Sequence, residues 1–492
     1  MLRRFLHLAA VVTLAFAAAS LLAAAEEAAG PAAIAPAPRP KPAHALLEAR
    51  FDGWDGMVAA RAIRVLVAPN QTHFFLDGAR QRGIIAEALQ ELEKDLNRQL
   101  GLGARRLHVV PIPVSRGELI PYLEQGRGDV AAANLTITPE REKRVDFTRP
   151  ISNAIDEVVV TGPRGPVLAR LEDLSGRAVH VRRSSSFWTH LEALNRGFEA
   201  RGMPPVELVP AHEYLETEDL LELTSAGVIA ITVADSHLAA FWSDVLPDLE
   251  VHEDLKLATG TRIGWAIRKD ATGLKAVLDP WIEANRQGRL LGNVLLKRYL
   301  RENRWVRASA GAAEEARLAP IFDHFRHYGG RYGFDWMLVA AQGYQESGLD
   351  QNKRSAAGAV GVMQLLPSTA RDKAVGIPNI DELEPNIHAG TRYLRHIVDT
   401  YFDDPAIDES NRLLFAFASY NAGPSKIRRL RREAQAEGLD PNQWFGNVEL
   451  IAARRIGRET AQYVANIYKY YVAFDLIEGQ HTSRAAARAA LR

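Results

Sequence analysis

The sequence of 492 residues contains no cysteine. Without cysteine there is no disulfide bond, no thiolate nucleophile, no zinc site with thiolate ligands and no lipid attached through a cysteine side chain. No other pattern in the chain indicates a bound metal or an organic cofactor, and we expect neither.

A net charge is also missing, because 60 Lys and Arg residues balance 60 Asp and Glu residues. A balanced chain has no general attraction for nucleic acid or anionic lipid, so any argument for a charged partner has to be local. We expect no nucleic-acid partner. The length exceeds what one hydrophobic core supports and predicts two to four domains at roughly 150 residues each.

Long apolar runs are absent except near residue 1. Arg3-Arg4 precedes an alanine-rich apolar run from Leu8 to Leu22, and Ala23-Ala24-Ala25 offers a cleavage site of small residues. This pattern predicts a signal peptide at residues 1–25, and hence export. The alternative is an uncleaved membrane anchor, because residues 5–25 approach the ~20 residues that span a bilayer.

Changes in composition divide the rest of the chain. Residues 26–61 are rich in alanine and proline and predict a linker. Strand patterns alternate with helical patterns over residues 62–302, which predicts an α/β domain. A polar joint at 303–317 follows, and residues 318–480 show helical patterns only, which predicts an all-α domain before a tail at 481–492. The runs that predict strands are 63–67, 107–112, 129–133, 157–161, 178–181, 206–209, 228–233 and 264–267.

The most informative stretch of the helical domain surrounds Glu346. Asp335 is placed to cap a helix that begins at Trp336, and this helix has an apolar body with one carboxylate near its C-terminal end. The helix dipole and partial burial both raise the pKa of a carboxyl in that position. A protonated carboxyl near neutral pH is what protonation of a glycosidic oxygen requires. Taken alone, such a glutamate is more often a solvated surface residue.

The residues around Glu346 resemble the soluble lytic transglycosylase family, whose fold is like that of goose-type lysozyme. Val362 stands where the family motif has leucine. The motifs that carry the resemblance, in chain order, are Glu346-Ser347, Ser355, Gly358-Ala359, Gly361-Val362-Met363-Gln364, Asn386-Ile387 with Gly390 and Tyr393-Leu394, Ala418 to Pro424, and Glu459-Thr460 with Tyr463-Val464 and Asn466-Ile467.

The resemblance implies cleavage of the β-1,4 bond between N-acetylmuramic acid and N-acetylglucosamine in peptidoglycan. Glu346 would protonate the leaving oxygen and then act as a base on the muramic acid C6 hydroxyl, which closes a 1,6-anhydro ring. No second carboxylate follows at a spacing that clearly suits a two-carboxylate hydrolysis. Asp350 lies only four residues further on, and we interpret it as a loop or surface residue.

The same resemblance assigns five further residues to the glycan site. It implies that Ser355, Met363 and Gln364 line the saccharide cleft. Tyr420 and Asn421 would lie opposite Glu346, with Tyr420 bonded to the carboxyl or orienting it. Packing alternatives remain, since Met363 can be a core residue, Ser355 a turn residue, and the Asn421 segment ordinary turn chemistry.

Residues 62 to about 300 resemble the family 3 extracellular solute-binding proteins, a fold of two lobes that binds amino acids. The resemblance implies that Arg141 binds a ligand carboxylate, with Thr136 beside it and Asp235 meeting a ligand ammonium. Ser185, at a predicted helix start, would offer N–H groups to the same anion. The alternatives are a solvated helix arginine and ordinary helix caps. The motifs are Gly128-Asp129-Val130, Thr136 to Arg141 and Val145 to Pro150.

The combined prediction is an α/β module of two lobes, like a periplasmic binding protein, followed by an all-α lysozyme-like domain. This order is similar to that of modular, membrane-bound lytic transglycosylases. It implies a periplasmic enzyme that acts on peptidoglycan glycan strands, binds an amino-acid- or muropeptide-like ligand in its first module, and attaches peripherally to the outer membrane, although no amphipathic membrane-binding helix stands out. The alternatives are a binding protein that only grips glycan and a lysozyme-type hydrolase.

Overall fold

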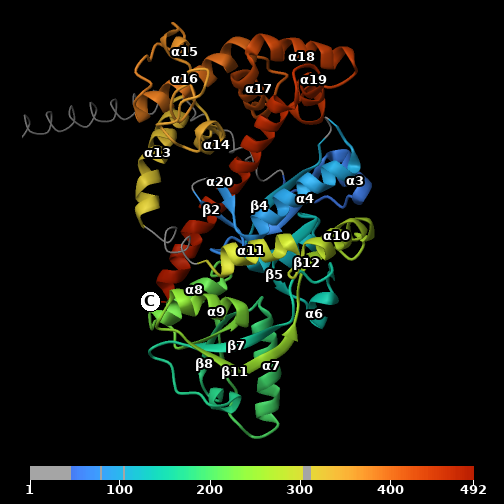
Figure 1. The fold of residues 1–492 in the computed structure, drawn as a ribbon, viewed down its shortest axis with the longest axis vertical. Coiled ribbons are helices and arrows are strands. Elements are labelled where there is room, and N and C mark those ends of the chain that lie inside the picture. Colours follow the sequence, from blue (N-terminus) through green and yellow to red (C-terminus); the bar gives the residue numbers. More distant parts are fainter. Residues whose placement is uncertain (1–45, 78–79, 104–105, 303–311, 492) are drawn as a thin grey trace, which may run out of the picture. The chain divides into compact units, whose positions relative to one another are not determined.

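The computed structural model describes residues 46–77, 80–103, 106–302 and 312–491. The predicted signal peptide, residues 26–45 of the first linker and residues 303–311 of the second linker lie outside the described residues. The chain first forms two α/β lobes and then a helical domain, so the predicted order of fold classes is confirmed (Figure 1). No helix of the described residues has the length and apolar character needed to cross a membrane.

The first lobe is built on a five-stranded sheet with the order β4–β1–β5–β12–β6. Strand β1 runs parallel to β4 and β5, whereas β12 runs antiparallel to β5 and β6. Its strands are β1 (Ala62–Val67), β4 (His108–Pro113), β5 (Val130–Thr136), β6 (Asp146–Phe147) and β12 (Ile263–Ile267), and a hairpin joins β2 (Phe75–Asp77) to β3 (Arg80–Arg82).

The second lobe has its own five-stranded sheet, with the order β11–β7–β10–β8–β9. Strand β10 is antiparallel to β7 and parallel to β8, and Asp235 on β10 pairs directly with Glu157 on β7. Its strands are β7 (Ile155–Thr161), β8 (Ala178–Arg182), β9 (Glu207–Ala211), β10 (Ile231–Asp235) and β11 (Glu250–Thr261).

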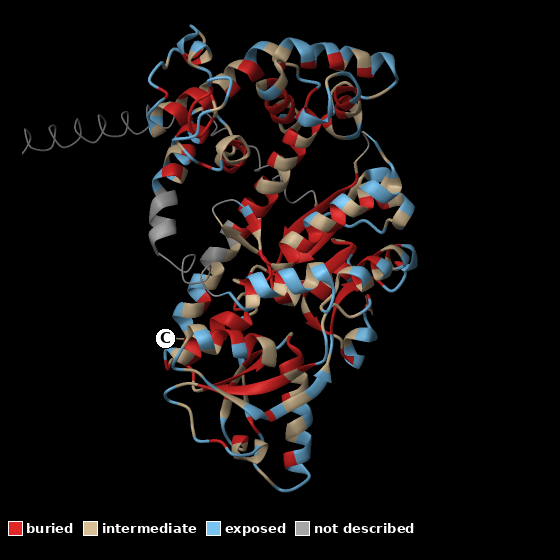
Figure 2. Ribbon diagram, viewed as in Figure 1, coloured by how far each residue is buried: buried red, intermediate tan, exposed pale blue. Residues whose placement is uncertain are grey.

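Helices cover the sheets of both lobes, as continuous apolar strands require. Figure 2 shows the strands of both sheets as largely buried. The helical segments of the first lobe are α3 (Trp54–Ala60), α4 (Ile84–Leu100), η1 (Arg116–Glu118), α5 (Leu119–Glu124), α6 (Pro139–Glu142), α10 (Thr272–Asn285) and α11 (Leu290–Leu300). Those of the second lobe are η2 (Leu171–Leu174), α7 (Ser186–Glu199), α8 (Thr217–Ser225) and α9 (Ser236–Val245).

The chain passes between the two lobes twice. It enters the second sheet between β6 and β7 and returns to the first sheet between β11 and β12. Strand β11 was not predicted, because most of its residues are polar, only one is buried, and no apolar alternation runs along it. Two helices, α10 and α11, end the α/β module, and a turn at Gly288, whose φ of 91° suits glycine, separates them.

The helical domain packs around one large core. Its helices are α13 (Ala312–Arg331), α14 (Trp336–Ser347), α15 (Pro367–Arg371), α16 (Leu383–Tyr401), α17 (Glu409–Ala422), α18 (Pro424–Ala436), a π-helical turn η3 (Trp444–Val448), α19 (Glu449–Arg455) and α20 (Arg458–Ala490). Fully buried aromatic side chains fill the core, among them Phe325, Phe415 and Trp444.

Helix α20 contacts both modules. It packs against α14, α17 and α19 of the helical domain and against β4 of the first lobe. The helix continues to Ala490, so most of the tail predicted at 481–492 is helical. This long helix therefore contacts both the candidate active site and the α/β module.

Candidate active site

Helix α14 places Glu346 at the edge of the helical domain. The predicted cap is present, since Asp335 Oδ1 accepts a hydrogen bond from the backbone N–H of Met337 at 3.0 Å. Residues Met337 to Gly343 are buried, and the helix ends at Gly348, whose φ of 73° is left-handed. Glu346 therefore lies in the last turn, where the core gives way to the surface.

The Glu346 carboxyl is half-buried and has one hydrogen-bonding partner on another helix. The Tyr463 hydroxyl, on α20, donates to Glu346 Oε1 at 2.5 Å. Lys353 Nζ lies nearby and donates to the backbone carbonyl of Glu346 at 2.7 Å. Burial raises the pKa of the Glu346 carboxyl to about 7, and the bond from Tyr463 and the charge of Lys353 oppose this only in part. Near neutral pH the carboxyl can therefore both give and take a proton.

Tyr463 belongs to one of the sequence motifs, but we did not predict it as a site residue. Its ring is buried, and its hydroxyl accepts a hydrogen bond from Gln342 Nε2 at 3.2 Å while it donates to Glu346. Burial and the nearby Glu346 carboxyl raise the pKa of Tyr463 well above its usual value. The side chain therefore remains a neutral phenol that donates to Glu346.

Tyr420 lies close to Glu346 but bonds elsewhere. Its hydroxyl donates to the backbone carbonyl of Met363 at 2.8 Å rather than to the carboxyl. Burial, followed by the charge of Glu346, raises the pKa of Tyr420 well above its usual value, which places the two groups within electrostatic reach. Tyr420 thus holds the Met363 segment beside Glu346, and the predicted hydrogen bond to the carboxyl is not formed.

Met363 has a fully buried side chain, so it does not present that side chain to a saccharide cleft. Its backbone N–H donates to Asn386 Oδ1 at 2.8 Å. A Cβ atom at Gly390 would lie 2.7 Å from Met363 Cβ, so only glycine allows this close packing. The packing alternative therefore describes the Met363 side chain. The Met363 carbonyl is linked to the site because it accepts the hydrogen bond of Tyr420.

The other predicted glycan residues lie at or near the surface. Ser355 Oγ accepts from the backbone N–H of Ala359 at 2.9 Å, as a turn residue does. Gln364 has a φ of 44°, which is strained for a residue with a side chain, and its amide donates to the carbonyl of Gly361 at 2.8 Å. Asn421 is exposed and accepts from Thr460 Oγ1 at 2.7 Å.

No second carboxylate acts on Glu346 in the part of the chain that the structure describes. The groups that shift its pKa, apart from burial, are Tyr463 and Lys353. Asp350 is exposed, and its Oδ1 accepts from the backbone N–H of Asn352 at 2.9 Å, which is an ordinary turn bond. Across the described ranges, no group of three or more acidic or histidine side chains is arranged to hold a metal ion.

In the α/β module, the four predicted ligand residues line one small cavity between the lobes. Its volume is only about 20 Å³, which is room for about one water molecule. The cavity is small because side chains of the two lobes bond across it. Arg116 of the first lobe forms a buried ion pair with Glu216 of the second at 2.6 Å, and Thr72 donates to Glu218 at 2.7 Å. The sequence carried no signal for these pairs.

Arg141 is already bonded to the protein. Its guanidinium donates to the backbone carbonyls of Thr136 and Ser184, both at 2.7 Å. Burial, with the charge of Arg116, lowers the pKa of Arg141 to about 10. Ser185 caps helix α7, since its Oγ accepts from the backbone N–H of Trp188 at 3.3 Å, so the helix-cap alternative describes its side chain.

Asp235 keeps one free oxygen. Its Oδ2 accepts a hydrogen bond from Asn134 of the first lobe, while Oδ1 is buried without a partner among the described residues. Burial and the neighbouring Glu157 carboxyl raise the pKa of Asp235 to about 7. An unpartnered buried carboxylate oxygen is costly, and a ligand cation would satisfy it.

Ion pairs tie helix α20 to both lobes. In its first half, Lys469 pairs with Glu93 of α4. Near its C-terminal end, Arg484 pairs with Asp219 of α8 at 2.6 Å, and Arg488 pairs with Glu222 of the same helix. Helix α8 follows directly on Glu216, so the helix that carries Tyr463 also contacts the segment that closes the cleft.

Two family models match this chain, one for each module. A model of the transglycosylase SLT domain matches residues 323–442, and a model of the family 3 bacterial extracellular solute-binding proteins matches residues 63–301. Among solved structures, an ancestral arginine-binding protein bound to arginine is 21% identical, with coverage of 48% of this chain and 97% of that chain and a TM-score of 0.39.

Curated relatives cover both modules together. A membrane-bound lytic murein transglycosylase F of Desulfosudis oleivorans is 30% identical over 377 residues, which are 72% of this chain and 78% of that protein. One of Maricaulis maris is 32% identical and covers 75% of this chain and 81% of that protein. The chain is a peptidoglycan lytic transglycosylase and belongs to the family of membrane-bound lytic murein transglycosylases F.

Proposed function

We propose that Glu346 is the only carboxyl group that catalyses glycan cleavage. Its protonated form gives a proton to the oxygen that leaves with N-acetylglucosamine as the C1–O bond of the muramic acid breaks. The resulting carboxylate takes the proton of the C6 hydroxyl, and O6 bonds to C1 to form the 1,6-anhydro ring. The observation that carries this proposal is a half-buried carboxyl whose pKa is about 7 and on which no second carboxylate of the described residues acts.

Tyr463 is proposed to position and tune this carboxyl. Because it donates to Oε1, the other oxygen is left for proton transfer, and the bond stabilises the carboxylate formed after the first step. Tyr420 and Met363 are proposed to support the site, because the Tyr420 hydroxyl donates a hydrogen bond to the Met363 carbonyl. Ser355 and Gln364, from the segment between α14 and α15, and Asn421, from the last turn of α17, are proposed to contact the glycan around Glu346.

Product analysis tests the reaction. The purified protein is incubated with isolated peptidoglycan, and the soluble fragments are identified by mass spectrometry. We expect muropeptides that end in 1,6-anhydro-N-acetylmuramic acid, which are lighter by one water than hydrolysis products. Reducing ends would reveal a lysozyme-type hydrolase, and the absence of fragments would leave a glycan-binding domain; either result contradicts the proposal.

The α/β module is proposed to bind an amino-acid- or muropeptide-like ligand that adjusts turnover. The buried free oxygen of Asp235 suits a ligand ammonium, and Thr136 and Arg141 line the same cavity. Because the cavity has room for only about one water, a ligand has to part the lobes and displace the bonds that close them. Helix α20 contacts both α8 and Glu346, which supplies a physical route between ligand binding and glycan cleavage.

Calorimetry tests the ligand site. Single amino acids and a muropeptide digest are titrated into the wild type and into Asp235→Asn and Arg141→Ala. The proposal predicts that a ligand binds the wild type and binds both variants more weakly. Equal affinity for all three proteins would reject this cavity as the ligand site.

The protein is proposed to act in the periplasm, attached peripherally to the outer membrane. Its relatives are named membrane-bound lytic murein transglycosylases, and the signal peptide predicted at 1–25 agrees with export. Fractionation of cells that express the full chain tests this: recovery with outer membranes and release by high salt or mild detergent are expected, and recovery in the cytoplasm would contradict it.

A further inference from the structure

A second cavity, of about 420 Å³, lies beside the cleft at the junction of the two lobes. Cavities that hold small molecules have volumes of about 300–1,000 Å³. The walls come from α4, α10 and β12 of the first lobe, from the start of α9 in the second, from the connecting segment between β6 and β7, and from α11. His73 and Asn134 line both cavities, so the two spaces are neighbours.

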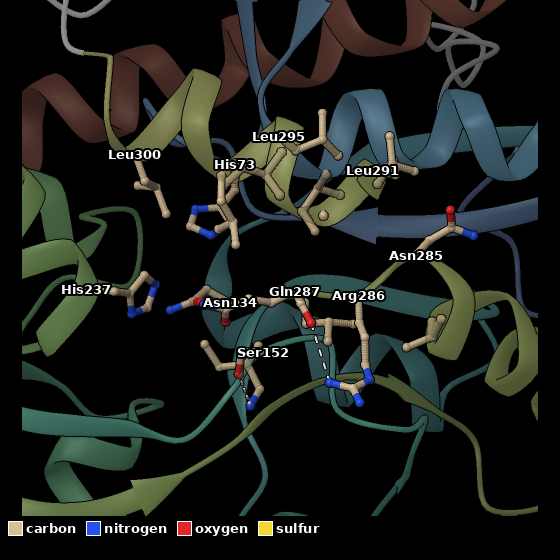
Figure 3. A pocket seen from close by; sticks show the side chains of 18 of the residues that line it. His73, Asn134, Ser152, His237, Asn285, Arg286, Gln287, Leu291, Leu295 and Leu300 are labelled. Carbon is tan, nitrogen blue, oxygen red and sulfur yellow. Dashed lines mark hydrogen bonds between the residues drawn. The ribbon is translucent and has the colours of Figure 1, made fainter. Parts of the chain in front are cut away.

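Aliphatic side chains form most of the lining. Figure 3 shows Leu291, Leu295 and Leu300 of α11 on one side of the space and Arg286 on the opposite side. Isoleucines of α4, α10, β7, β12 and the segment between β6 and β7 complete the apolar wall, together with the stacked indoles of Trp265 and Trp281, whose centroids are 5.9 Å apart. An apolar lining of this size favours a ligand with an extended hydrocarbon part.

The polar groups of the lining include strong donors but no carboxylate. Arg286 and Arg301 are the charged residues that line the cavity among the described residues, and neither Asp nor Glu is part of its wall. Trp265 is only 2% exposed, and its buried indole N–H has no hydrogen-bond partner in the described structure. Burial lowers the pKa of His73 to about 3 and that of His237 to about 4, so both rings are neutral. The site therefore suits an acceptor group or an anion.

Arg286 is available to an anionic group. Its side chain is 32% exposed, its guanidinium contacts Glu283 at a long 3.3 Å, and it contacts the carbonyl of Gln287 at 3.4 Å. Glu283 has two other arginine neighbours, Arg149 and Arg289. Arg286 can therefore turn to a ligand without leaving Glu283 unpaired.

We propose that this cavity binds a single straight-chain fatty-acid anion, with its alkyl chain against the leucines of α11 and its carboxylate at Arg286. The chain length that fits is limited by the volume of the cavity, and the donors in the lining select a carboxylate over an ammonium. This inference does not depend on the ligand proposed for the cleft, because the two sites differ in chemistry and in most of their residues.

Isothermal titration calorimetry of the full chain with hexanoate, octanoate and decanoate, each below its micellar concentration, tests the apolar wall. The Kd is expected to fall about fourfold for each added methylene, because burial of one methylene contributes about 0.8 kcal/mol. An affinity independent of chain length, or no binding at all, would overturn the proposal.

Arg286→Gln tests the head group, with Arg289→Gln as its matched control, because both arginines contact Glu283 but Arg289 does not line the cavity. Arg286→Gln should weaken decanoate binding at least tenfold and leave 1-decanol binding unchanged. The control should bind both like the wild type. Equal losses for decanoate and decanol would contradict a carboxylate at Arg286.

Leu291→Trp tests the position, because the larger side chain fills the cavity. Leu290→Trp is the matched control, since Leu290 is 83% exposed and does not line the cavity. Loss of decanoate binding in Leu291→Trp alone, with thermal unfolding like that of the wild type, is the expected result. Decanoate binding that is equal in the two variants would mean that the anion binds elsewhere on the surface, and the proposal would fail.

Discussion

Tyr463 donates a hydrogen bond to Glu346 at 2.5 Å, although 117 positions separate the two residues in the chain. The bond joins α14 to α20 at the point where the core of the helical domain reaches the surface. It lowers the pKa of a carboxyl that burial raises, so the two effects together hold this group near pH 7. The proposed chemistry depends on that balance.

Tyr463→Phe should reduce turnover and move the pH dependence upwards. Loss of a hydrogen bond to an ionised group costs about 1.5–3 kcal/mol, which corresponds to a loss of about tenfold or more in rate. Because the bond favours the carboxylate, its removal raises the pKa of Glu346, and the fall of activity at high pH should begin at a higher pH. Release of soluble muropeptides measured from pH 5 to 9 checks both effects. A slower enzyme with an unchanged pH profile would mean that Tyr463 only packs.

The stability of the protein should depend on pH through Glu346. Its pKa is about 7 in the folded state and 4.5 in a free carboxyl, so the folded state binds more protons between these values. The stabilisation is complete below pH 4.5 and is lost as the pH rises through 7. Between pH 5 and pH 8, the free energy of unfolding of the wild type should therefore fall by on the order of 2 kcal/mol relative to that of Glu346→Gln, after allowance for partial exposure.

Urea unfolding of the wild type and of Glu346→Gln at pH 5 and pH 8 gives this difference directly. Glu409→Gln is the control, because Glu409 is exposed at the start of α17. A difference that stays constant with pH would contradict a raised pKa at Glu346, and so would the same change in the control.

Arg116→Met should open the lobes. In the closed form, the substitution would leave the Glu216 carboxylate buried without its main partner, at a cost of about 3–5 kcal/mol. Opening lets water reach Glu216 and avoids this cost. Small-angle scattering should show a larger radius of gyration, and amides of residues 217–225 should exchange faster. Arg144→Met, which breaks the exposed pair with Glu124 inside the first lobe, should change neither quantity.

The double variant Arg484→Gln, Arg488→Gln should uncouple the modules, because these two arginines of α20 form its ion pairs with α8. A soluble muropeptide digest is expected to change the turnover of the wild type. It should bind the double variant but leave its turnover unchanged. If the digest changes turnover equally in both proteins, the coupling does not pass through these pairs.

Local features of the fold could be predicted from the sequence because they depend on neighbouring residues. The cap by Asp335, the apolar body of α14 and the position of Glu346 in its last turn follow from spacing along one helix. The buried strands of both lobes were predicted for the same reason. Strand β11 was not, because an exposed strand at a sheet edge has no apolar pattern to reveal it.

Contacts between distant segments could not be predicted. The motif around Tyr463 marked a helix, but only the packing of α20 on α14 brings its hydroxyl to Glu346. Tyr420 was expected to bond the Glu346 carboxyl or to orient it, and its hydroxyl donates to the Met363 carbonyl of a distant segment, which no local pattern indicates. The pair of Arg116 and Glu216 depends on how two lobes close, which no local pattern encodes.

The assignment of Glu346 as the single acid and base is tested most directly by Glu346→Gln, assayed on isolated peptidoglycan with mass spectrometry of the products. We expect a folded protein that releases no anhydro-muropeptides above the background of a blank digest, because glutamine can neither give nor take the proton. Asp350→Asn, which changes the nearest carboxylate in the sequence, should cleave like the wild type. Anhydro-muropeptides at wild-type rates from Glu346→Gln would contradict the proposed mechanism.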